Sequence, residues 1–113
     1  MKFNVTNAAT LSASLGFGDA GNKTHDAWCS VYFSGTLGAG ATIELQLSPD
    51  ASITSDPVNG VTDANSRWFT PTNLTLTSIT ATNGVVHFAG RYRKARAAIV
   101  NTQASDNVIV EVV

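Results

Sequence analysis

The stretch Ala41-Thr42-Ile43-Glu44-Leu45-Gln46-Leu47 alternates apolar and polar residues with a period of two. In a β-strand this alternation places Ile43, Leu45 and Leu47 on one face and the polar side chains on the other. Thr, Ser and Asn are abundant in the chain, whereas the strong helix formers Leu, Glu, Lys and Gln are scarce. Further strands are predicted over 9–17, 27–34, 74–79, 85–89, 91–100 and 107–113. The sequence therefore predicts an all-β fold.

The length and composition of the chain predict a single domain. The chain has 113 residues, of which 43% are hydrophobic and 13% are charged. We expect residues 1–113 to form one small antiparallel β-sandwich or jelly-roll-like barrel of about seven or eight strands. Residues 1–8 are a candidate N-terminal arm, because they are small and polar. Residues 51–65 are rich in Asp, Asn, Ser and Thr and are predicted to form one long surface loop.

Two local patterns make sharper predictions about the strands. Asn83-Gly84 is the strongest short hairpin signal in the chain, so we expect the strand over 74–79 to pair with the strand over 85–89. Residues 9–17 alternate without interruption. This alternation predicts one shared face for Ala9, Leu11, Ala13, Leu15 and Phe17.

The charge of the chain is nearly balanced. Seven Lys and Arg against eight Asp and Glu give a formal net charge of -1, which provides no argument for a nucleic-acid or membrane partner. No stretch approaches the roughly 20 consecutive apolar residues of a membrane helix, and the first residues lack the apolar core of a signal peptide. We expect a protein that stays in a cytoplasm or leaves it by a route other than secretion.

The sequence contains no recognisable catalytic or cofactor motif. His25, His87 and the lone Cys29 do not have the spacing of a metal site, and Cys29 is predicted to pack in the core. The glycine-rich residues 35–40 lack the Lys and Ser/Thr of a phosphate-binding loop. We therefore expect no metal, no cofactor and no enzymatic activity.

Basic residues are concentrated in Arg91-Tyr92-Arg93-Lys94-Ala95-Arg96, which holds four of the seven Lys and Arg residues. Three interpretations compete for this cluster. It protects a solvated sheet edge by its charge, it docks on an acidic partner protein, or it binds nucleic acid. The last is disfavoured by the negative net charge and by the absence of an aromatic RNA-binding signature. The candidate partner-binding residues are Arg91, Arg93, Lys94 and Arg96.

Two segments carry a resemblance to a known group of proteins. The strand and corner at residues 40–50, which end in Ser48-Pro49-Asp50, are followed at a distance by Arg67-Trp68-Phe69. This arrangement resembles the small β-sandwich proteins encoded beside capsid genes in tailed bacteriophages. Gly90-Arg91-Tyr92-Arg93 is similar to the start of a later strand in the same group. The resemblance spans roughly residues 35 to 100.

The resemblance implies a virion structural protein without catalytic residues. The first expectation is a capsid decoration, or cement, protein that binds the assembled lattice at the capsid surface after synthesis in the host cytoplasm. Its expected partners are the major capsid protein and neighbouring copies of itself, as a homo-oligomer on the capsid. One alternative is a neck, tail or fibre-associated component. Another is a carbohydrate-binding module in which Trp28, Tyr32 and Trp68 stack on sugar rings, although Trp68 is favoured as a cap on the core.

Overall fold

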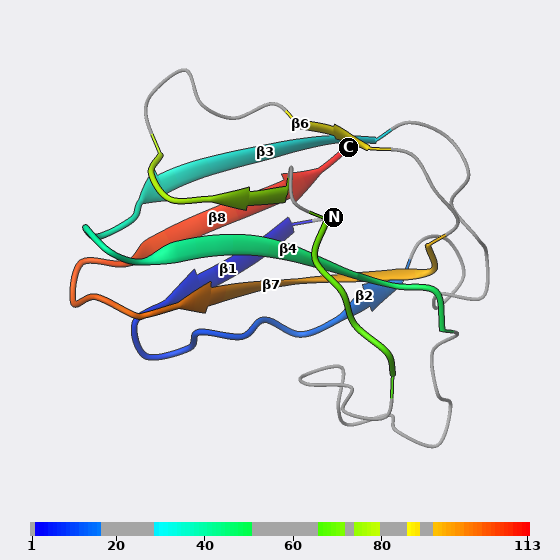
Figure 1. The fold of residues 1–113 in the computed structure, drawn as a ribbon, viewed down its shortest axis with the longest axis horizontal. Helices are drawn as coiled ribbons and strands as arrows, with labels where there is room; N and C mark the ends of the chain where they lie inside the picture. The colour runs from blue at the N-terminus through cyan, green and yellow to red at the C-terminus, as the bar shows by residue number, and fades with distance from the viewer. Residues whose placement is uncertain (1, 17–28, 51–65, 72–73, 80–85, 89–91) are drawn as a thin grey trace.

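The computed structural model of the chain describes residues 2–16, 29–50, 66–71, 74–79, 86–88 and 92–113, and the regular elements in this part of the chain are β-strands (Figure 1). They pair antiparallel into two sheets, ordered β1-β8-β3-β6 and β2-β7-β4-β5. The all-β, antiparallel prediction is therefore confirmed. The strands are β1 (Lys2–Thr6), β2 (Leu15–Gly16), β3 (Cys29–Thr36), β4 (Thr42–Ser48), β5 (Thr75–Leu76), β6 (Val86–Phe88), β7 (Lys94–Val100) and β8 (Asn107–Val112).

One face of each sheet supplies the hydrophobic core. Ile43, Leu45 and Leu47 of β4 are fully buried, as their alternation predicts, and the polar residues between them are half-buried. Full burial of such a side chain contributes about 1.5–3 kcal/mol relative to exposure. A single cluster joins residues of both sheets: Phe3, Val5, Val31, Phe33, Ala41, Ile43, Leu45, Leu47, Leu74, Ala95, Ala97, Ile99, Val108, Val110 and Val112.

The beginning of the chain is a strand and not an arm. β1 pairs with β8 along its whole length, and Phe3 and Val5 are buried. The prediction of an arm over residues 1–8 is therefore wrong for residues 2–6. Two apolar residues among polar neighbours are too few to establish a period, so the long-range pairing with β8 was not visible in the sequence. The loop expected over residues 51–65 lies outside the described residues.

The hairpin expected at Asn83-Gly84 does not join β5 to β6. β5 pairs with β4, whereas β6 pairs with β3 of the other sheet. Leu74, beside β5, is fully buried, and Leu76 packs against the core. The prediction was wrong because pairing with a long strand and burial against the core outweigh a local turn preference. The chain between β5 and β6 therefore connects the two sheets, with residues 80–85 outside the described part.

The alternation predicted over residues 9–17 is interrupted at Ser12. Leu11 and Leu15 both pair with β7, but their registers differ by one residue. The Ser12 hydroxyl accepts the backbone N–H of Ala97 at 2.8 Å, in the place that a backbone carbonyl takes in a regular ladder. The uninterrupted period of two expected for this segment is therefore wrong at Ser12, where the backbone register against β7 shifts by one residue. Phe17 lies outside the described residues.

The core assignment predicts different effects for two residues of similar size. Replacing the fully buried Leu45 by Ala should lower the free energy of unfolding by about 2–5 kcal/mol, because it removes core contacts and leaves a cavity. Replacing Ile109, which is 36% exposed, by Thr should change it by less than about 1 kcal/mol. Urea unfolding measures both values. Equal losses for the two variants would contradict the burial pattern.

Candidate functional site

The predicted basic cluster lies at the start of β7, which is an inner strand. β7 lies between β2 and β4, so the interpretation of the cluster as a protected sheet edge is wrong. Ala95 and Ala97 belong to the core, and the alternation of the strand places Lys94 and Arg96 on the opposite face. Arg91 lies outside the described residues.

Lys94 is buried, with a relative exposure of 1%. Its Nζ donates to the Ser66 hydroxyl and lies 5.6 Å from the centre of the Trp68 ring. A hydroxyl and an aromatic face thus take the place of water around the ammonium group. A side chain at this depth does not present its charge to a partner, so the docking role expected for Lys94 does not match its position in the structure.

Arg96 is half-buried and held from two sides. Its Nε donates to Oε1 of Gln46 at 2.7 Å, and its guanidinium carbon lies 4.2 Å from the centre of the Trp68 ring. Gln46 in turn donates from Nε2 to Oε1 of Glu44 at 2.8 Å. These contacts fix the guanidinium group on the face of β4 and β7 that is turned away from the core. We call Gln46, Ser66, Trp68, Lys94 and Arg96 the Trp68 cluster.

Arg93 precedes β7 and is half-buried. Its backbone N–H donates to the Ser48 carbonyl at 2.8 Å, which ties this residue to the end of β4. Arg93 and Arg96 are therefore the two predicted docking residues whose side chains are partly accessible within the described part of the chain.

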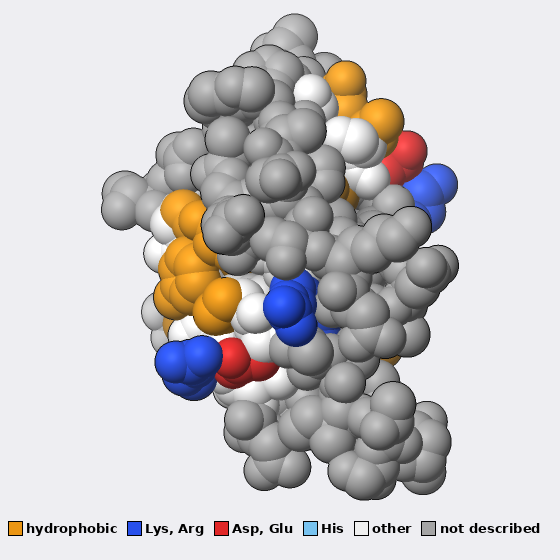
Figure 2. Space-filling model, turned by 90° about the vertical axis from the view of Figure 1, so that its right-hand side faces the viewer, with side chains coloured by type: hydrophobic (Ala, Val, Ile, Leu, Met, Phe, Trp, Pro, Cys, Tyr) orange, Lys and Arg blue, Asp and Glu red, His pale blue; other side chains and the backbone are white. Residues whose placement is uncertain are grey.

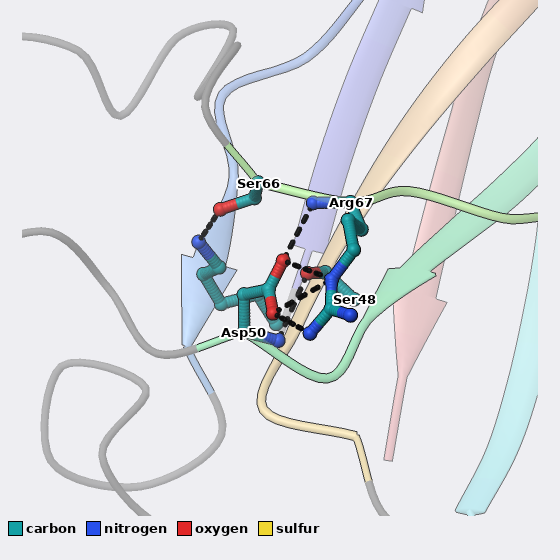
Figure 3. A network of polar contacts seen from close by, with 5 residues as sticks. Ser48, Asp50, Ser66 and Arg67 are labelled. Atoms are coloured by element: carbon teal, nitrogen blue, oxygen red, sulfur yellow. Dashed lines mark hydrogen bonds and ion pairs between the residues drawn. The ribbon is translucent and has the colours of Figure 1, made fainter.

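Asp50 and Arg67 form an ion pair that the sequence analysis missed (Figure 3). Nη2 of Arg67 lies 2.6 Å from Oδ1 of Asp50, and the backbone N–H of Arg67 donates to Oδ2 at 2.6 Å. The backbone N–H of Asp50 donates to the Ser48 hydroxyl at 3.1 Å. The available signal was the opposite charge at the two ends of the predicted 51–65 loop, but sequence distance alone did not show that these ends meet.

The contacts with Arg67 shift the titration of both partners. Hydrogen bonds from the Arg67 side chain and backbone lower the pKa of Asp50 from its ordinary value of 3.8 to about 2. The same pairing raises the pKa of Arg67. The pair lies at the surface, with 82% of the Arg67 side chain and 25% of the Asp50 side chain exposed, so solvent screens much of its effect on stability.

Three separate segments meet at the end of β4. Phe69 exchanges two backbone hydrogen bonds with Leu47, at 2.9 and 3.1 Å. Its ring centre lies 5.3 Å from that of Tyr92, an ordinary distance for a tilted aromatic pair. Together with the Asp50–Arg67 pair, these contacts bring together the segments around residues 47–50, 67–69 and 92–93.

The predicted sugar-stacking residues do not form a common platform among the described residues. Trp68 contacts the side chains of two cations on β7, whereas Tyr32, which is 45% exposed, belongs to β3 of the other sheet. Trp28 lies outside the described part of the chain. Trp68 thus packs against the positively charged groups of Lys94 and Arg96 on the sheet.

The described charged side chains do not merge into one basic patch on the face shown in Figure 2. Basic side chains lie at separate places there, and at two of these places an acidic side chain lies beside them. Among the described residues, Lys2 pairs with Glu111, at 3.6 Å, and Arg67 pairs with Asp50. The electrostatic features of this surface are therefore local.

Within the described residues, no three His, Cys, Asp or Glu side chains come together as a metal site, and no helix is long and apolar enough to cross a membrane. Comparison of the chain with protein-family models, curated proteins and solved structures gives no match.

The Asp50–Arg67 pair predicts an acid-dependent contribution to stability. Because the folded-state pKa of Asp50 is lowered, its contribution is present above about pH 4 and is lost as the pH falls towards about 2. The melting temperature of Asp50→Asn should lie below that of the wild type near neutral pH and approach it at about pH 2. Arg67→Gln should behave in the same way. A difference that is independent of pH would show that the pair does not titrate as described.

Proposed function

We propose that this chain is a non-enzymatic structural protein of a virion, and that it acts as a capsid decoration protein on the assembled lattice. The observation that carries the proposal is the meeting of three segments at the end of β4. These are the segments that resemble the small β-sandwich proteins of tailed bacteriophages, and they contact one another through the Asp50–Arg67 pair, the Leu47–Phe69 pairing and the Phe69–Tyr92 ring contact. The resemblance thus corresponds to a connected structural unit.

The proposed architecture is a single β-sandwich. Its support is the hydrophobic cluster that takes side chains from β1, β3 and β8 of one sheet and from β4 and β7 of the other. Two sheets that share one core in this way pack face to face in a sandwich. Such a module has two outward faces and several strand edges on which to bind neighbours.

The use of the buried polar groups supports a structural role. The Ser12 hydroxyl binds the N–H of Ala97, and the Asp106 carboxylate accepts the backbone N–H groups of Gly38 and Gln103, both at 2.7 Å. In the described residues, no buried side-chain nitrogen or oxygen lacks a hydrogen-bond partner. The hydrogen bonds of Ser12 and Asp106 hold loops and strands in place, as expected of a structural protein.

The proposed contact to the capsid uses the arginines near the end of β4. Arg96 is held by Gln46 and Trp68, so little side-chain freedom remains to be lost when it binds a carboxylate. Arg93 lies at the start of the same strand, and Arg91 completes the proposed set. The partner is an acidic surface of the major capsid protein, and neighbouring copies of this chain occupy adjacent positions on the lattice.

If the chain is a decoration protein, we expect it to be present at a high copy number in purified virus particles. Binding many equivalent sites on the assembled shell should also raise the temperature at which the shell disrupts, by mass action. Quantitative mass spectrometry of purified heads measures the copy number. Presence only at the neck, the tail or a fibre would replace the proposal by its alternative, and absence from particles would refute both.

The proposed arginine contact predicts binding that weakens with added salt. Arg93→Gln and Arg96→Gln should each reduce the affinity for the capsid by about 1.5- to 5-fold, the range for exposed ion pairs, and the effect should shrink at high salt. Arg93→Lys keeps the charge and is the matched control. Lys2→Gln, which changes a basic residue of the other sheet, should bind as the wild type does. Equal affinity of all four variants would exclude the arginine contact.

A further inference from the structure

β1 is an edge strand, so one side of its backbone faces away from β8. The backbone N–H of Asn7 donates to the Asp106 carbonyl at 3.3 Å, in the register that β1 keeps with β8. Hydrogen-bonded and non-hydrogen-bonded residues alternate along an antiparallel strand, so the odd-numbered residues of β1 bond to β8. The even-numbered residues Lys2, Asn4 and Thr6 therefore direct their backbone groups to the open edge.

Among the described residues, a turn closes the open edge at its Thr6 end. The N–H of Thr6 donates to the Ala9 carbonyl at 3.0 Å, and the Thr6 hydroxyl accepts from the N–H groups of Ala8 and Ala9. Within the described part of the chain, no such turn covers Lys2 and Asn4. On this side, their backbone N–H and C=O groups can therefore form hydrogen bonds with a further strand.

A shallow groove of about 370 Å³ lies beside the same edge. It is lined by Lys2, Phe3 and Asn4 of β1 and, from the segment that follows, by Ala9, Leu11, Ser12 and Ala13, of which Ala9 and Ala13 are small and exposed. The volume is in the range of known binding sites. An open ladder and a groove alongside it are the two parts of a site that takes up an extended peptide.

We propose that this groove binds an extended segment of a partner protein, which adds to β1 as a further antiparallel strand. The segment alternates apolar and polar residues, and it carries a carboxylate beside Lys2. Lys2 is the charged residue of the groove, and 67% of its side chain is exposed. Glu111 lies 3.6 Å from the Lys2 ammonium on the β8 side, so an acidic residue on the added strand flanks Lys2 from the other side.

A single strand fits this edge better than a whole second copy of the chain. Residues 9–13 follow β1 and flank its open edge. Two copies paired edge to edge would each bring this segment to the place where the β1 edge of the other copy lies. An isolated peptide needs only the spacing of one strand, about 4.8 Å. The proposal does not depend on capsid binding, because the isolated chain and a peptide suffice to test it.

The probe is a short acetylated peptide in which Val alternates with Thr and one Thr is replaced by Asp. A second peptide carries Asn in place of this Asp. Titration of the isotope-labelled full chain should shift the NMR amide signals of Lys2, Asn4 and residues 9–13. The Asp peptide should bind about 1.5- to 5-fold more tightly than the Asn peptide, as for an exposed ion pair, and Lys2→Gln should abolish this preference.

Substitutions at Asn4 separate backbone pairing from side-chain contact. Asn4→Pro removes an N–H that points to the open edge and leaves the bonds to β8 in place, so it should weaken peptide binding by about 2- to 10-fold. Asn4→Thr keeps the N–H and should bind as the wild type does. The spectra of both variants without peptide show whether they fold.

Ala13→Glu gives a second test that leaves β1 unchanged. Ala13 is exposed, so the fold should tolerate the substitution, while the added charge should weaken the Asp peptide more than the Asn peptide. The proposal is overturned if the β1 signals do not shift with millimolar peptide, or if Asn4→Pro and Asn4→Thr bind equally. It is also overturned if the chain alone self-associates through β1, since the occupant is then a second copy.

Discussion

The pairing of β7 with β4 is the constraint on which the rest of the structure depends. All seven residues of β4 are paired with β7, and the side-chain period of a strand is two. This single register therefore decides which residues of both strands enter the core. It places Ala95 and Ala97 inside and leaves Lys94 and Arg96 on the other face. A slip by one residue would bury two cations in the hydrophobic cluster, where an unpaired charge costs several kcal/mol. The core and the Trp68 cluster thus lie on opposite faces of the paired strands β4 and β7.

The fold was predicted well where apolar and polar residues alternate locally. It was predicted poorly where segments far apart in the sequence pair with each other. The inner face of β4 was predicted from its alternation alone, and it is the most completely buried part of the sheet. The errors occurred where distant pairing decided the outcome. Phe3 and Val5 belong to a strand that pairs with β8, at the other end of the chain, and Ser12 breaks its own alternation by bonding to Ala97. Neither effect leaves a local pattern, because each partner lies far away in the sequence.

The candidate site was predicted only in part, again because pairing between distant segments decides its structure. The charge of the β7 segment was visible in the sequence, but its environment was not. Trp68 lies near both Lys94 and Arg96 because its neighbour Phe69 pairs with Leu47 at the end of β4. The burial of Lys94 and the restraint of Arg96 follow from this return of the chain. The cluster therefore has fewer accessible charges than the sequence suggests, and one arginine of the proposed capsid contact, Arg96, is already held by Gln46 and Trp68. The open edge of β1 is a separate surface, on the other sheet.

The β4–β7 register is tested most directly by NMR. Leu45 and Ala97 are a non-hydrogen-bonded pair, because β7 bonds to β4 through its even-numbered residues, and the Cα atoms of such a pair lie about 4.5 Å apart. This register predicts a strong nuclear Overhauser effect between the Hα protons of Leu45 and Ala97. A strong Hα contact from Leu45 to Arg96 or Ala98 instead would mean a register shifted by one residue. That result would contradict the core, the Trp68 cluster and the proposals built on them.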